Sequence, residues 1–107
     1  MNDYQAFAAK EAEHLLTLME QVAKQDPGVE KLLNAMRPDV EKLIHGLEPL
    51  PSRVLDGWSY YFSPDGPHNI FDGHRELAQA EADLAFAVRR GSFEAYDAAV
   101  RMFESFR

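Results

Sequence analysis

The apolar residues in the first part of the chain recur at three- and four-residue spacing, and this periodicity limits the fold more than any other feature. Such spacing places apolar side chains on one face of an α-helix and charged side chains on the other. The apolar face consists of Tyr4, Phe7, Ala8, Ala12, Leu15, Leu16, Met19, Val22 and Ala23. With Asn2 or Asp3 as N-cap, the pattern predicts a helix over residues 3–25 that must pack against another element.

A second helix is predicted to begin directly after the first. Asp26 is a suitable N-cap, and Pro27 suits the first helical position because its missing N–H would have no partner there. The apolar phase continues across Pro38, so one kinked helix explains the pattern better than two separate helices. Gly46 is the predicted stop. The first two helices therefore form a tight hairpin.

Residues 48–72 form an irregular connection in which repeated prolines and glycines exclude a long helix. The connection also carries an aromatic cluster, which consists of Trp58, Tyr60, Tyr61, Phe62 and Phe71. Two interpretations of this cluster stay open. The rings either cover the open end of the core or form a binding surface, since Trp and Tyr bring a large contact area at low entropy cost.

A third long helix is predicted to follow Asp72 as its N-cap. It ends at Arg89-Arg90-Gly91, which places cations in the last turn and a glycine just beyond it. Its apolar stripe is weaker than that of the first helix, because Glu81 interrupts it and Phe86 falls on the opposite side.

The last predicted helix has Ser92 as N-cap and continues almost to Arg107. Its apolar residues fall roughly on one face; they are Phe93, Tyr96, Val100, Phe103 and Phe106. We therefore expect an all-α fold, either a four-helix bundle or two packed helical hairpins with an irregular aromatic-rich connection. We expect residues 1–107 to form a single helical domain, because a chain of 107 residues has no room for a second core.

Composition disfavours several classes of partner. Eighteen acidic against eleven basic residues give a net charge of -7, which repels phosphate backbones and anionic membrane surfaces. No uninterrupted apolar stretch approaches the length that spans a bilayer. We expect neither a nucleic-acid nor a membrane partner. The absence of cysteine fits a reducing compartment, so a cytoplasmic location is expected.

The best metal-ligand pattern is Glu11-Ala12-Glu13-His14, since Glu and His three residues apart present both side chains to one metal. Di-iron sites in helical bundles need a second such pair. Here His45 follows Glu41 by four residues, and the last helix contains no histidine. The set is incomplete, so no metal site is expected.

Two further histidines, His68 and His74, flank a loop that has Asp65 and Asp72 nearby. Such a group is able to form a mononuclear metal site or a general acid–base pair. Histidines in a loop rich in Pro and Gly are more often solvated or bonded to local backbone, and no nucleophile stands beside them. We expect no catalytic residue, no metal and no cofactor.

Three short stretches of the predicted helices carry a resemblance to a known family. They are Pro27-Gly28-Val29-Glu30-Lys31-Leu32-Leu33-Asn34-Ala35, Glu76-Leu77 with Ala80, and Arg90-Gly91. Together they resemble the small helical immunity proteins that protect type VI secreting bacteria from NAD-degrading effector toxins. This chain departs from them by its longer aromatic connection and an added C-terminal helix. The resemblance implies a cytoplasmic bacterial protein that plugs a toxin's active-site cleft without a cofactor, and it transfers no individual binding residues.

The sequence thus predicts an inhibitory protein-binding domain, not an enzyme. According to this hypothesis, the chain is an immunity or antitoxin protein that neutralises a toxin or effector enzyme by occluding its active site. Its partner-binding residues are expected in the acidic and aromatic connection. These residues are Asp56, Trp58, Tyr60, Tyr61, Phe62, Asp65, His68 and Phe71. One alternative is a homo-oligomeric structural or regulatory bundle, in which the connection or the last helix packs against its own copy. The other is a metal-binding bundle enzyme.

Overall fold

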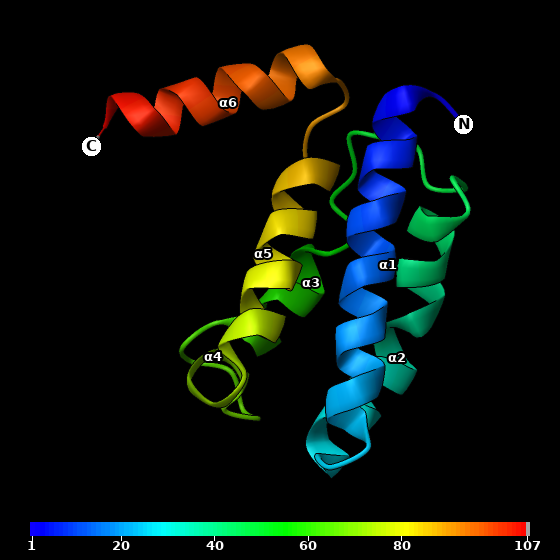
Figure 1. Ribbon diagram of the computed structural model, residues 1–107, viewed down its shortest axis with the longest axis vertical. Helices are drawn as coiled ribbons and strands as arrows, with labels where there is room; N and C mark the ends of the chain where they lie inside the picture. Colours follow the sequence, from blue (N-terminus) through cyan, green and yellow to red (C-terminus); the bar gives the residue numbers. More distant parts are fainter. Residues whose placement is uncertain (107) are drawn as a thin grey trace.

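The computed structural model describes residues 1–106, and its all-α class confirms the prediction. Its elements are α1 (Asp3–Ala23), α2 (Pro27–Ile44), α3 (Asp56–Ser59), the 3₁₀-helix η1 (Tyr60–Phe62), α4 (Ile70–Gly73), α5 (Arg75–Val88) and α6 (Phe93–Ser105). Figure 1 shows α1, α2 and α5 running along the body of the molecule, while α6 crosses beyond one end of it.

The predicted hairpin of the first two helices is confirmed, and local capping explains both of its helix starts. The side chain of Asn2 accepts a hydrogen bond from the Gln5 N–H at 2.8 Å, and the Gln5 side chain accepts one from the Asn2 N–H at 2.9 Å. Asp26 accepts from the N–H groups of Gly28 at 3.0 Å and Val29 at 3.3 Å. These contacts pair backbone donors that have no partner within the helix.

The second helix continues through Pro38, as predicted, and ends at Ile44. Gly46 then adopts a φ of +67°, a backbone conformation that favours glycine. A Cβ at this position would also lie 2.7 Å from the Met1 methyl carbon, so the chain turns here in close contact with its own N-terminus.

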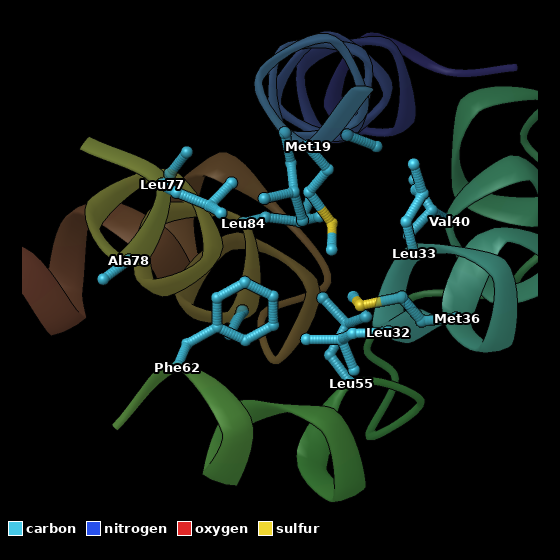
Figure 2. Close-up of a cluster of buried hydrophobic side chains, with 14 of the residues drawn as sticks. Met19, Leu32, Leu33, Met36, Val40, Leu55, Phe62, Leu77, Ala78 and Leu84 are labelled. Carbon is cyan, nitrogen blue, oxygen red and sulfur yellow. The ribbon is translucent and has the colours of Figure 1, made fainter. Parts of the chain in front are cut away.

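The core lies between α1, α2, α5 and the connection. Figure 2 shows Met19 from α1, side chains such as Met36 and Val40 from α2, and Leu77 and Leu84 from α5 converging on one centre. The connection closes this centre with three buried side chains, which are Leu55, Phe62 and Ile70. The connection therefore occupies the place that a fourth long helix takes in a bundle.

The predicted cap of the third long helix is wrong. Asp72 lies inside the short helix α4, and α5 begins only at Arg75. The two helices are separated because His74 leaves the helical region, with φ -139° and ψ 67°. The carboxylate of Asp72 instead lies 3.6 Å from the guanidinium of Arg75.

The last helix forms where predicted but lies outside the core. Ser92 caps it by accepting from the Ala95 N–H at 3.1 Å, and the helix ends at Ser105. No side chain between Phe93 and Ser105 is buried, so the arrangement departs from a four-helix bundle. The physical reason is that the connection already fills the remaining side of the core. Arg107, to which the helix was predicted almost to extend, lies outside the described residues.

Candidate protein interface

The start of the connection is fixed by a carboxylate that two arginines share. Asp56 lies 2.7 Å from the Nε of Arg53 and 2.9 Å from the Nε of Arg89. The hydrogen bond from Arg53, followed by that from Arg89, lowers the pKa of Asp56. Asp56 was predicted to contact a partner, and the structure shows it bracing the connection against the end of α5.

Trp58 is half-buried and anchors the aromatic cluster to the rest of the body. Its indole N–H donates to Asp39 of α2 at 2.9 Å, while its ring packs against the core. The centre of its ring lies 6.2 Å from that of Tyr61, which is also half-buried. A buried indole normally finds such an acceptor, and here the acceptor fixes the orientation of the ring.

The exposed part of the cluster centres on Tyr60, whose side chain is 55% exposed. Its ring contacts Tyr61 edge-on at 5.6 Å, and Tyr61 stacks on His68 at 6.3 Å. Asp65 lies exposed on the turn between these residues. We call Trp58, Tyr60, Tyr61, Asp65 and His68 the connection surface.

Besides Asp56, two predicted binding residues lie outside this surface. Phe62 is buried in the core, so its assignment to a partner-binding surface is wrong. Burial follows from its position at the end of η1, where its ring points into the body. Phe71 is half-buried and carries the guanidinium of Arg75 over its ring, 4.5 Å from the centroid. The cluster thus divides: Phe62 covers the core, while Tyr60 faces solvent.

Beside the connection, an open pocket of about 660 Å³ is lined by residues of α5 and by Ser59, Phe62, Ser63 and Phe71. Glu81 lies in its wall, only 4% exposed, and accepts a hydrogen bond from the Ser59 hydroxyl at 2.6 Å. Burial raises the pKa of Glu81, while the Ser59 hydrogen bond and the charge of Arg89 lower it by less. Sequence reasoning did not assign this pocket, although an acid interrupting an apolar stripe was its signal.

Replacing Glu81 with Gln is expected to stabilise the protein near neutral pH by on the order of 1 kcal/mol, because Gln keeps the Ser59 hydrogen bond and removes a buried charge. The raised pKa makes a contribution to stability that is fully present below the pKa of the unfolded chain and is lost as pH rises through the folded pKa. The difference in the free energy of unfolding between Glu81→Gln and the parent protein is therefore expected to grow as the pH rises. Urea denaturation from about pH 4 to 8 measures it.

Glu76→Gln is the matched control for this series, because Glu76 lines the same pocket from the same helix but is exposed. The free energy of unfolding of this variant is expected to change with pH in the same way as that of the parent protein. If the free energies of unfolding of Glu81→Gln and the parent protein differed by the same amount at every pH, the raised pKa of Glu81 would be contradicted.

His68 and His74 both lie beside the start of α2: a Cβ on Gly28 would stand 2.7 Å from the Nδ1 of His68, and Asp26, the partner of His74, is the N-cap of this helix. His74 lies 3.1 Å from Asp26, and this hydrogen bond is the main cause of a lowered Asp26 pKa. His68 stacks on Tyr61, while His14 and His45 are exposed. Across residues 1–106, no three His, Asp or Glu side chains are grouped so as to hold a metal ion.

An aromatic ladder joins α6 to the body, and sequence reasoning missed it. It consists of Tyr4, Phe7, Phe86, Phe93, Tyr96 and Phe103. Phe93 meets Tyr4 edge-on at 5.0 Å, and Tyr96 meets Phe86 edge-on at 5.2 Å. Phe86, which falls opposite the core stripe of α5, thus supports α6.

Beyond the ladder, α6 leaves large apolar side chains uncovered. Met102 is 63% exposed and Phe106 is 82% exposed. Figure 1 shows the C-terminal half of α6 extending past α5 without another element of residues 1–106 beside it. The molecule therefore presents two surfaces suited to protein contacts, the connection surface and the open face of α6.

Within residues 1–106, no helix combines the length and apolar character that crossing a bilayer requires. In comparisons with known proteins, the chain matches no family model, no curated protein and no solved structure.

Proposed function

We propose that this chain is an inhibitory protein-binding domain of the immunity or antitoxin kind, which uses the connection surface to occlude the active site of a toxin or effector enzyme in the cytoplasm. The observation that carries the proposal is the exposed ring of Tyr60, supported from behind by half-buried rings. Exposed Tyr next to fixed aromatic neighbours is typical of residues that contribute most to protein–protein affinity.

Rigidity of the connection surface supports this role. The indole of Trp58 is tied to Asp39, and Asp56, two residues before Trp58 and outside this surface, is held between two arginines. Side chains that are already fixed lose little conformational freedom on binding, which leaves more of the contact energy as affinity. A surface of this kind suits an inhibitor that must fit a cleft without rearrangement.

Charge indicates the chemistry of the partner. The chain carries a net charge of -7, and Asp65 lies exposed within the connection surface. A basic cleft, such as one that binds an anionic substrate, would attract this surface at long range and speed association. The expected partner is therefore a toxin or effector whose active-site rim is basic.

The test is capture of partners from lysate of the source organism by the tagged chain, followed by an activity assay of the captured protein. We expect one stoichiometric protein with an enzymatic activity that the added chain inhibits. Tyr60→Ala should weaken the complex at least about tenfold, since an exposed aromatic anchor contributes on the order of 1.4 kcal/mol or more. Its helical circular dichroism should stay unchanged because Tyr60 is not in the core.

Phe106→Ala serves as the matched control, because it removes another exposed aromatic ring on α6, away from the connection. This variant should keep full inhibition. Equal affinity of the Tyr60→Ala variant and the parent protein would remove the connection surface from the interface. A captured enzyme whose activity the chain leaves unchanged would contradict inhibition itself.

A further inference from the structure

The apolar side of α6 is only half covered by the body. Phe93, Tyr96 and Phe103 contact the aromatic ladder rings of α1 and α5. A second row lies about 100° further round the helix and consists of Ala95, Ala99, Met102 and the C-cap residue Phe106. Their spacing of four, three and four residues places them in one line along the helix, the pattern of a helix–helix seam. We call this row the outer seam.

The outer seam is open to solvent. Ala95 is exposed, Met102 and Phe106 are mostly exposed, and Ala99 between them is half-buried. The charged residues of α6 lie on the opposite arc; they are Glu94, Asp97, Arg101 and Glu104. The outer seam therefore carries no charged side chain that would favour its exposure to solvent. An exposed apolar row of this kind is typical of a surface that contacts another protein.

The order of side chains along the outer seam is complementary to itself. The small residues Ala95 and Ala99 occupy one end, and the large residues Met102 and Phe106 occupy the other. When two such rows run antiparallel, each Phe106 meets an Ala95 and each Met102 meets an Ala99. A parallel arrangement would instead place Phe106 against Phe106 and leave a gap between the alanines.

We infer that α6 pairs with the α6 of a second copy of this chain, in an antiparallel two-fold dimer joined along the outer seam. An isologous contact needs a surface that is complementary to itself, and the outer seam meets this condition. Its position on an overhanging helix leaves it accessible to a second molecule (Figure 1).

The available area agrees with such a dimer. The exposed portions of the seam residues, together with that of Phe103, which flanks the seam three residues before Phe106, amount to on the order of 500 Å² per copy when fully covered. Two copies would bury about 1,000 Å² in total, which is the lower bound for a specific interface. The dimer is therefore expected to dissociate on dilution. The inference of a dimer is independent of the proposed inhibitory function, because the connection surface lies on other elements than α6.

Light scattering and sedimentation of the full chain over a range of concentrations test the inference. The mass should rise from 12.2 kDa towards twice that value as concentration increases. Phe106→Glu is expected to raise the dissociation constant at least about tenfold, because it places a charge in the seam. Ser105→Glu is the matched control, since it adds the same charge on the polar arc next to Phe106 and should leave the mass unchanged.

A residue exchange tests the antiparallel register. Ala99→Met alone crowds two large side chains, and Met102→Ala alone leaves a gap, so each is expected to weaken the dimer about tenfold or more. The double variant restores one large and one small residue in each contact and should return to within about threefold of the parent protein. Ala and Met are both good helix formers, so circular dichroism should show α6 intact in every variant.

Two results would overturn the inference. A parent protein that keeps the mass of one chain up to about 1 mM would show that the outer seam does not join copies. A double variant no stronger than the single variants would reject the antiparallel pairing. Because the readout is mass, neither result depends on whether a toxin partner exists.

Discussion

Leu55→Ala is expected to lower the free energy of unfolding by about 3 kcal/mol, although Leu55 lies in the connection between helices. Its side chain is fully buried and belongs to the same core cluster as Leu32 and Met36 of α2 (Figure 2). Removal of the side chain takes apolar contacts from the centre of the core and leaves a cavity that rigid neighbours cannot fill. Urea denaturation followed by circular dichroism measures the change.

The control for this variant is Leu47→Ala, which makes the same chemical change at an exposed leucine. Its effect is expected to stay within about 0.5 kcal/mol, as is usual for surface substitutions. If Leu55→Ala were as mild as Leu47→Ala, the connection would be a loop on the outside of the core rather than one of its walls.

Gly66→Ala is expected to destabilise the protein by about 2 kcal/mol and to displace the ring of Tyr60. A Cβ on Gly66 would lie 2.5 Å from the carbonyl oxygen of Tyr61 and 2.9 Å from that of Tyr60. These atoms belong to the backbone of η1, so they cannot yield as a flexible side chain does. Denaturation gives the loss of stability, and the fluorescence of the single tryptophan, Trp58, reports the shift of its neighbours.

Gly57→Ala provides the opposite expectation within the same segment. A Cβ at Gly57 would meet nothing within 4 Å, and the residue lies in α3. Alanine there should be neutral or stabilise by about 0.5 to 1 kcal/mol, because it restricts the unfolded chain and favours the helix. Equal effects at Gly57 and Gly66 would indicate that the close contact at Gly66 does not determine stability.

The helices that local residues specify were predicted well from the sequence. The first two helices begin where their N-caps indicate, because capping depends on residues two or three positions away. Pro38 did not break α2, as the continuous apolar phase indicated. These features depend only on residues that are close in the chain, so the spacing of apolar residues predicts them directly.

The connection was harder to predict because contacts with residues far away in the chain determine which of its side chains are buried and which are exposed. Tyr60, Tyr61 and Phe62 are adjacent in the sequence, yet the first is exposed, the second half-buried and the third buried. Trp58 is fixed by Asp39, which lies on another helix. Composition identified the aromatic cluster, but only packing decides which ring faces solvent.

The open position of α6 entered the sequence analysis only through an alternative, the homo-oligomer in which the last helix packs against its own copy. An apolar stripe predicts that a helix packs on one side, but it does not say whether the partner lies in the same chain. Phe86 was the clue, because it falls on the side of α5 opposite to the core and contacts α6. A single aromatic residue out of phase is too weak a signal to place a whole helix.

The separation of α6 from the core has a consequence for how this protein evolves. Residues such as Leu84 or Met36 are constrained by every neighbour they touch, so a change at one requires changes at others. Met102 and Phe106 are mostly exposed, so substitutions there are expected to leave the fold intact. Single substitutions at these two positions are therefore expected to change a contact along the outer seam without loss of the fold, whereas the other helices carry the core.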